Sequence, residues 1–427
     1  MWREYLDHKL GLPWVSSNYK NAFSNNPSYS PVNEMWGRRI LYKLVQEKKA
    51  KGEIVHSLYG GITEIVEDGE LMPIGAPEWI TGTIIEGLGT WKGWGRKQEE
   101  LKELITEWYN KTYDLDIDAS SEVALVIGGA FGVDAAARIT SGPGDEVLIM
   151  DPDYVTYLPQ VASTGARTIS VPLKEENGEW HFEYEELEKR ANPRCKILYM
   201  SNASNPSGFF YTEEDLKSIA ELAEKYDFMV FHDQVAEEFI LDEDSKLISM
   251  ASIPGMKDRT IIASSFSKMY NCHAFRTGWI VANKDFCELA LLFRGWVNDG
   301  IVKPAVEASL AILREENKKQ RKKWVDKKLA TLRKKRDHMK KRLSEIEGVT
   351  PNTPKGHYWA WPNVSSFGMT TQKLAEHLVK EANVFCRPGT WYGTNGEGHF
   401  RLNFSIPTDY MDEALDKVQS GLEKLLS

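Results

Sequence analysis

The sequence has few cysteines, no long apolar run and no excess of positive charge, and each absence excludes a class of protein. The four cysteines, Cys195, Cys272, Cys287 and Cys386, lie far apart and form no CxxC pair, so they predict neither a zinc site nor a disulfide framework. No stretch reaches roughly 18 uninterrupted apolar residues, and the start, MWREYLDHKL, lacks the apolar core of a secretory signal. We therefore expect a cytoplasmic protein with no membrane segment and no metal site.

The charge balance also argues against a polyanionic partner. Lys plus Arg is 53 and Asp plus Glu is 62, which gives a net charge of −9 and no overall attraction to nucleic acid or to an anionic membrane. Fourteen Lys or Arg residues crowd into residues 318–342, but no helix-turn-helix or other binding motif accompanies them. We interpret this run as the solvated outer face of a helix and expect no nucleic-acid partner.

The composition is that of a globular chain of 427 residues, with 42% apolar and 27% charged residues. From residue 122 onward, seven short apolar runs alternate with helical patterns such as FGVDAAARIT and TEEDLKSIAELAEKYD. The runs are EVALVIGG, EVLIMD, RTISVPL, CKILYMSN, FMVFHDQ, TIIASSF and GWIVAN. This alternation predicts an α/β fold with a mostly parallel seven-stranded sheet between helices. Ligands of such sheets gather at the carboxyl ends of the strands.

The remaining segments predict a smaller C-terminal α/β domain and a long connector. Apolar residues recur at helical spacing between residues 305 and 347, which indicates one or two long helices. The strands GHYWAWP and HFRLNFS and the helices TTQKLAEHLVKEA and DEALDKVQSGLEKLL follow. A further helix is expected from residue 34 to about 51. We divide the chain into an N-terminal arm with part of the small domain (1–70), a large domain (71–310), and the small domain with its connecting helix (311–427).

One lysine in the sequence has a position suited to catalysis. Lys268, in SFSKMYNCHAFRTG, follows the buried run TIIASSF, and desolvation would favour its neutral amine, the form that attacks an aldehyde. Taken alone, Lys268 is better explained as a loop lysine in solvent. Arg276, eight residues later, and Ser265, three residues earlier, are suited to hold a phosphate. The small residues Gly129 and Ala130, between a strand and a helix, form a turn that favours an anion or serves only as a turn.

Three further side chains suggest an aromatic, positively charged ligand. Asp233 ends the run FMVFHD, where a buried carboxylate needs a cationic partner such as a protonated pyridine nitrogen. Asn205, in the turn SNASNPSGFF, is able to donate a hydrogen bond to a phenolate oxygen. Tyr154, in DPDYVTY, is able to stack on a flat ring.

The order and spacing of these motifs resemble the class I/II aminotransferases, the fold-type I enzymes that depend on pyridoxal 5′-phosphate. The resemblance rests on NPSG, then Asp233, then SFSK with Arg276, then GEG with Arg401 three residues after Gly398. It implies that Lys268 forms the Schiff base with the cofactor and that Arg401 clamps the substrate α-carboxylate. It also implies contacts to the cofactor ring from Tyr154, Asn205 and Asp233, to its phosphate from Ser265, Arg276 and the turn Gly129, Ala130 and Phe131, and to the substrate from Gly75.

The resemblance further implies a homodimer with active sites at the interface and transamination of an L-amino acid through an external aldimine and a quinonoid carbanion. A lyase, cyclase or oxidase would use the same carbanion and stays an alternative. A non-catalytic regulator is a third possibility, although the first 70 residues show no DNA-binding module. Arg294, Asn298 and Asp299, in FRGWVNDG, resemble the dimer-facing loop of the family, but they leave the substrate side chain open.

Two departures from the family pattern stand out. Three residues after Asp233, where the family carries a tyrosine that bonds the ring oxygen, this chain has Ala236. One cofactor contact is therefore missing unless another group, such as His232 or His273, supplies it. The segment GTWKGWGRKQ is rich in tryptophan where the family commonly has a tyrosine that reaches the partner's phosphate; Trp91 and Trp94 either take that place or belong to the core.

Overall fold

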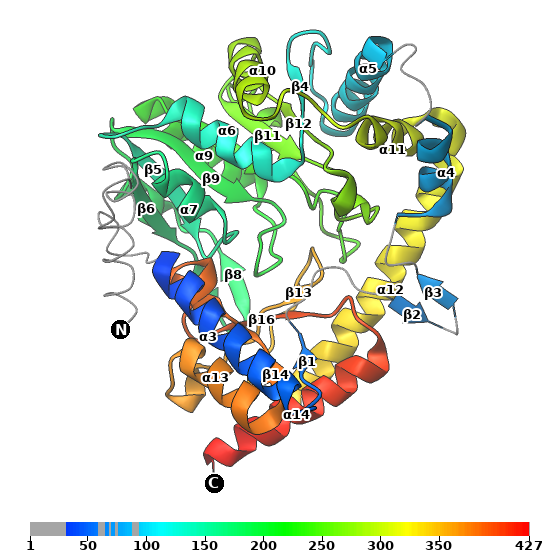
Figure 1. The fold of residues 1–427 in the computed structure, drawn as a ribbon. Coiled ribbons are helices and arrows are strands. Elements are labelled where there is room, and N and C mark those ends of the chain that lie inside the picture. The colour runs from blue at the N-terminus through cyan, green and yellow to red at the C-terminus, as the bar shows by residue number, and fades with distance from the viewer. Residues whose placement is uncertain (1–30, 59–64, 68–69, 73–75, 88–93, 427) are drawn as a thin grey trace, which may run out of the picture.

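The structure is a computed structural model that describes residues 31–58, 65–67, 70–72, 76–87 and 94–426. Its centre is a seven-stranded sheet in the order β4-β12-β11-β10-β9-β5-β6 (Figure 1). Only β12 runs antiparallel to its neighbours β4 and β11, so the prediction of a mostly parallel sheet is confirmed. The strands are β4 (Val123–Val126), β5 (Glu146–Asp151), β6 (Arg167–Pro172), β9 (Cys195–Ser201), β10 (Met229–Asp233), β11 (Thr260–Ser264) and β12 (Gly278–Val281).

Both faces of this sheet are buried, which explains why its strands are apolar without alternation. Along β4, Ala124 and Val126 belong to one apolar cluster, and Val123 and Leu125 belong to the other. The helices α6 (Gly129–Thr140), α7 (Tyr157–Ala162) and α10 (Lys284–Asn298) cover the first face. On the second face lie α5 (Trp94–Tyr113), α8 (Tyr184–Glu188) and α9 (Glu213–Tyr226).

A smaller α/β unit closes the chain, as expected. It contains the three-stranded sheet β13 (Trp359–Ala360), β16 (Phe400–Asn403) and β15 (Arg387–Pro388), with α13 (Thr371–Ala382) and α14 (Thr408–Leu426). The N-terminal helix α3 (Pro31–Ala50) packs on α13, and β1 (His56–Ser57) pairs with β14 (Val384–Phe385). Residues 31–57 thus join the small unit, while the domain limits stay a prediction.

The connector consists of two helices, α11 (Lys303–Leu313) and α12 (Lys318–Ser344). In Figure 1, α12 is the long yellow helix that runs from the large sheet unit down to the small unit. The reading of its basic run as a solvated face holds for the exposed lysines of the helix, such as Lys322 and Lys323, but not for two others. Lys328 and Lys335 are buried, and their amines donate to main-chain carbonyls, because α12 passes between the two units instead of over their surface.

Short elements complete the described chain. They are the strand pairs β2 (Ile65–Glu67) with β3 (Glu70–Met72) and β7 (Lys174–Glu176) with β8 (Glu179–His181), the helix α4 (Glu78–Gly87), and single 3-10 turns such as η2 (Cys272–Phe275). The helix α4 packs against α11.

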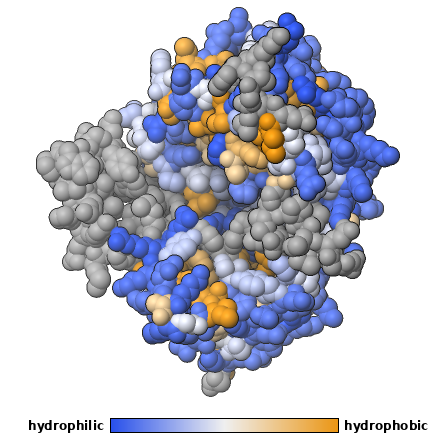
Figure 2. Space-filling view, turned by 45° about the vertical axis from the view of Figure 1, so that its right-hand side comes forward, coloured by the Kyte–Doolittle hydropathy of each residue, from blue (hydrophilic) through white to orange (hydrophobic). Residues whose placement is uncertain are grey.

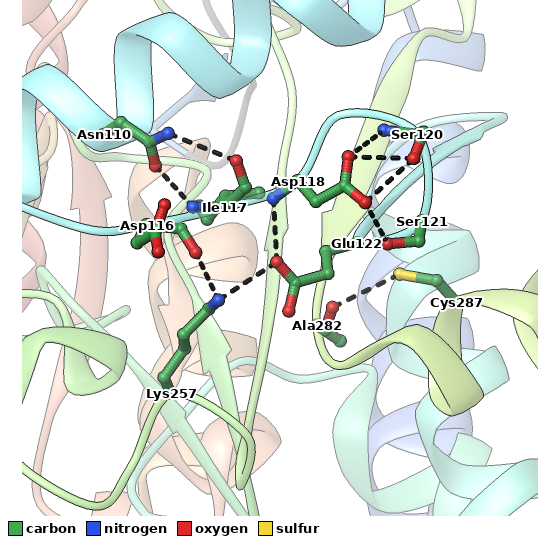
Figure 3. A network of polar contacts seen from close by, with 10 residues as sticks. All are labelled: Asn110, Asp116, Ile117, Asp118, Ser120, Ser121, Glu122, Lys257, Ala282 and Cys287. Carbon is green, nitrogen blue, oxygen red and sulfur yellow. Dashed lines mark hydrogen bonds and ion pairs between the residues drawn. The ribbon is translucent and has the colours of Figure 1, made fainter.

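A polar network fixes the segment that enters β4 (Figure 3). The side chain of Asn110, near the end of α5, accepts from the N–H of Ile117 at 2.9 Å and donates to the carbonyl of the same residue at 3.2 Å. Glu122 accepts from the N–H of Asp118 at 2.8 Å and pairs with Lys257 at 3.1 Å. These bonds set the start of β4, the strand that leads to the turn at the N-terminus of α6.

Candidate active site

A cavity of about 410 Å³ lies at the carboxyl ends of the central strands, where ligands of α/β sheets bind. The strand β10 delivers Asp233 to it, β11 leads to Ser265 and Lys268, and β4 leads to the turn before α6. Nine of the ten described residues expected in the site line this cavity. They are Gly129, Ala130, Tyr154, Asn205, Asp233, Ser265, Lys268, Arg276 and Arg401.

Asp233 forms the acidic end of the cavity. Its carboxylate accepts from the hydroxyl of Tyr157 at 2.8 Å and from the N–H of Val235 at 3.0 Å. Burial raises the pKa of the Asp233 carboxyl, and these two donors together with the charge of Lys268 oppose that rise. A cationic ligand atom beside Asp233 would favour the ionised form, which is the chemistry that a protonated pyridine nitrogen offers.

Lys268 is the amine of the cavity. Burial lowers the pKa of this amine, and the positive charges of Arg401 and Arg276 act in the same direction, while Tyr154 and Asp233 act against it. The neutral amine is the nucleophilic form. The environment that was expected from the strand-end position of this lysine is therefore present.

Arg276 closes the end of the cavity at the N-terminus of α6. Its guanidinium donates to the carbonyls of His273 at 3.0 Å and Ile127 at 3.1 Å. Gly128, the N-cap of α6, has a φ of 93°, and a Cβ there would lie 2.5 Å from Nη2 of Arg276. Backbone N–H groups at a helix start and a fixed guanidinium are the donor set that a phosphate takes. This end of the cavity fits the phosphate of pyridoxal phosphate.

Arg401 and Asn205 are joined by a hydrogen bond where the small unit borders the cavity. Nη1 of Arg401 donates to Oδ1 of Asn205 at 3.0 Å, so the amide nitrogen of Asn205 keeps its N–H groups for another acceptor. The guanidinium of Arg401 lies 3.6 Å from the ring centroid of Trp359 and 4.8 Å from that of Tyr392. Burial lowers the pKa of Arg401 to about 10, so the side chain stays cationic at neutral pH.

Other residues singled out from the sequence are either not lining residues or lie outside the described part of the chain. Phe131 is not a lining residue: its N–H bonds the carbonyl of Gly128 and its ring packs on Phe293. Gly75 and Trp91 fall outside the described residues, and Trp94 begins α5. None of the described residues Arg294, Asn298 and Asp299 lines the cavity, and Arg294 donates to the carbonyl of Leu125 at 2.7 Å.

Ala236 lines the cavity. The two histidines considered as donors in place of the missing tyrosine hydroxyl differ in their access to the cavity. His232 is not among the lining residues; its Nδ1 accepts from the N–H of Met250, and burial lowers its pKa to about 3. His273 does line the cavity, and burial also lowers its pKa. Of these two, only His273 has access to a ligand in the cavity.

The structure adds wall residues that the sequence did not reveal. Arg387 and the segment of His357, Tyr358 and Trp359 line the cavity. The strand GHYWAWP was recognised, but its face toward a ligand was not, since a two-residue strand shows no alternation. Arg387 lies opposite Arg401 in the register of β15 and β16, a pairing that no sequence motif signals.

Two other features of the described chain bear on function. No group of three or more His, Cys, Asp or Glu side chains within the described ranges is arranged to hold a metal ion. No helix in the part of the chain that the structure describes combines the length and hydropathy needed to cross a membrane.

Comparisons with known proteins agree with this geometry. The family description "Aminotransferase class I and II" matches residues 89–418. An aromatic-amino-acid aminotransferase of Thermococcus litoralis is 30% identical over 76% of this chain and 82% of its own length. An aspartate aminotransferase of Pyrococcus abyssi is 31% identical with the same coverage.

Solved structures show the same fold. An aromatic aminotransferase from Pyrococcus horikoshii superimposes with a TM-score of 0.77 at 28% identity and covers 89% of this chain and 99% of its own. An aspartate aminotransferase from Thermus thermophilus gives a TM-score of 0.79 at 21% identity, with 89% and 95% covered. The chain therefore belongs to the class I and II aminotransferases, and it is a fold-type I enzyme whose cofactor is pyridoxal phosphate.

Proposed function

We propose that the cavity binds pyridoxal phosphate together with the amino-acid substrate, and that Lys268 is the catalytic residue of this aminotransferase. The observation that carries the proposal is the gathering, in one cavity, of a buried amine, a buried carboxylate and a cationic cradle at a helix start. When bound, pyridoxal phosphate supplies an aldehyde that takes up the substrate's amino group and a ring that withdraws electrons from the α-carbon.

The side chains of the cavity would share the binding of the cofactor. Asp233 would keep the ring nitrogen protonated, and Asn205 would donate to the ring oxygen through its free amide N–H. Tyr154 would stack on the ring. Ser265, Arg276 and the amides of Gly129 and Ala130 would bind the phosphate at the N-terminus of α6.

Lys268 and Arg401 would handle the substrate. Arg401, fixed by Asn205 and Trp359, would bind the α-carboxylate through two parallel hydrogen bonds. The neutral amine of Lys268 would then take the proton from the substrate α-carbon and return it to another carbon. The relatives reported above carry aminotransferase names, which supports transamination over lyase, cyclase or oxidase chemistry.

The cavity also favours an acidic substrate or amino-group acceptor. Arg387 and Arg401 are cross-strand neighbours, both are buried, and both line the cavity. Like charges directly opposite each other on paired strands repel, so a second carboxylate placed between them would relieve the repulsion. The hydroxyl of Tyr392 accepts from Arg387 at 2.5 Å and orients it.

We also propose a homodimer in the cytoplasm. Leu289, Leu292 and Trp296 lie at helical spacing on α10, and the side chain of Trp296 is 81% exposed; an apolar face of this kind marks an interface. Figure 2 shows apolar side chains exposed in the upper half of the face drawn there. The four cysteines are buried and unpaired, which suits a reducing compartment.

Covalent trapping tests the role of Lys268. Borohydride reduction of the protein loaded with pyridoxal phosphate should fix the cofactor on the peptide that contains Lys268, because its amine lines the cavity and burial lowers its pKa toward the nucleophilic form. Peptide mapping by mass spectrometry gives the position. Lys268→Ala should lose the label, whereas the exposed-lysine control Lys323→Ala should keep it. A label on any other lysine of the native protein would refute the assignment.

Steady-state kinetics on an acidic and a neutral amino acid test the two arginines. Arg387→Met should lower kcat/KM for glutamate by about tenfold or more, the loss of one hydrogen bond to a charged group, and leave the neutral substrate within about twofold. Arg401→Lys should lower kcat/KM for both substrates, because lysine cannot reproduce the bidentate fork. An equal loss on both substrates in Arg387→Met would contradict the second-carboxylate site.

Substitution of Ala236 tests whether the ring oxygen of the cofactor lacks the hydrogen bond that a tyrosine would donate from this position. Ala236→Tyr should lower the pH at which the cofactor's visible absorbance changes, because a donor to the ring oxygen stabilises its anionic form and weakens its hold on the neighbouring proton. Ala236→Phe is the matched control, since it adds the same ring without the hydroxyl. Coincident titration curves for the two variants would mean that another group, such as His273, already bonds this oxygen.

Analytical ultracentrifugation tests the dimer. At micromolar concentration the protein should sediment as two chains, and Trp296→Glu should shift it toward one chain, because a charge would then stand on the apolar face of α10. The exposed position makes this substitution harmless to folding. A single chain in the native protein would contradict the proposal.

A further inference from the structure

A second lysine, outside the cavity, bonds the main chain of the first. Lys328, on α12, is 1% exposed, and its Nζ lies 2.9 Å from the carbonyl oxygen of Lys268 and 2.6 Å from that of Met269. The third partner is Oδ1 of Asn271 at 2.9 Å. All three partners are acceptors, and an ammonium has three N–H groups, so each acceptor receives one donor.

The loop that carries Lys268 depends on these donors. Within the described residues, no backbone N–H bonds the carbonyl of Lys268 or of Met269. The carbonyl of Met269 also accepts from Nε1 of Trp324 at 2.9 Å, and Trp324 again belongs to α12. Buried carbonyls need hydrogen-bond partners. The side chains of α12 therefore supply the donors that backbone N–H groups do not supply in this loop.

The surroundings of Lys328 suit a buried cation. Its Nζ lies 5.5 Å from the ring centroid of Phe239 and 5.8 Å from that of Trp324, within the range of a cation–π contact. Burial lowers the pKa of Lys328 to about 7, while Cys272 and the carboxyl of Glu238 raise it. A buried lysine without a function would cost stability that a leucine would not.

We propose that Lys328 is a positioning residue of the aminotransferase reaction: its amine holds the main chain of Lys268 from α12 and thereby keeps the side chain of Lys268 aimed into the cavity. This inference rests on the proposed role of Lys268. Lys328 is not among the residues that line the cavity, so it is a positioning residue and not a ligand-binding one. A small displacement of a reacting group costs rate much more than it costs binding.

Three variants test this role in the loaded enzyme. Lys328→Met removes the donors and keeps the length, Lys328→Arg restores a cation with N–H groups, and Lys323→Met is the matched control at an exposed lysine of the same helix. In Lys328→Met we expect the peptide of residues 265–271 to exchange its amide hydrogens about tenfold faster. We expect kcat to fall about 100-fold with KM within about threefold, and Lys328→Arg to recover part of both.

The outcomes separate this inference from the proposed function. Unchanged exchange and unchanged kcat in Lys328→Met, with borohydride still labelling Lys268, would overturn the positioning role alone. Labelling of another lysine would overturn the proposed function first. If Lys328→Met does not fold, Lys328→Gln replaces it, because its amide keeps two N–H groups on a shorter side chain than the three donors of the lysine. It should speed exchange of the same peptide about threefold, and the native rate would overturn the inference.

Discussion

Asp233 and Lys268 face the same cavity, and burial shifts their pKa values in opposite directions, upward for the acid and downward for the amine. Each shift disfavours the charged form of its group, because a buried charge needs a partner. A ligand with a cationic ring nitrogen and an electrophilic carbon satisfies both groups at once. The requirement to hold these two side chains and the guanidinium groups of Arg276 and Arg401 around one cavity governs the rest of the structure.

The fold meets this requirement because different strands and helices supply the side chains of the cavity. Parallel strands end at one edge of the sheet, so β10 and β11 deliver the acid and the amine from adjacent strands, and β4 brings the helix start of α6 beside them. Arg401 comes from β16 of the small unit. The helix α12 lies between the two units, and its buried lysines, Lys328 and Lys335, donate to carbonyls on either side. A basic helix thus serves as an internal support.

The sequence revealed the large sheet and several of the residues that line the cavity, for the same physical reason. Strands buried on both faces are continuous apolar runs, and the polar residue that ends such a run, as Asp233 does, has to face a ligand. Arg387 and Trp359 could not be found in this way, because their strands have two residues each and show no alternation. The role of Lys328 could not be predicted because it is one of many lysines on α12. Helical spacing identifies the apolar stripe of this helix, but it does not identify which lysine donates to a carbonyl of another segment. Phe131 is not among the lining residues, and its N–H bonds the carbonyl of Gly128.

The most direct measurement is a crystal structure of the protein grown with pyridoxal phosphate. The account predicts electron density continuous from Nζ of Lys268 to the cofactor, with the ring nitrogen within hydrogen-bond distance of Asp233 and the phosphate at Arg276 and the start of α6. Cofactor density in another cavity, or a ring turned so that its nitrogen points away from Asp233, would contradict it.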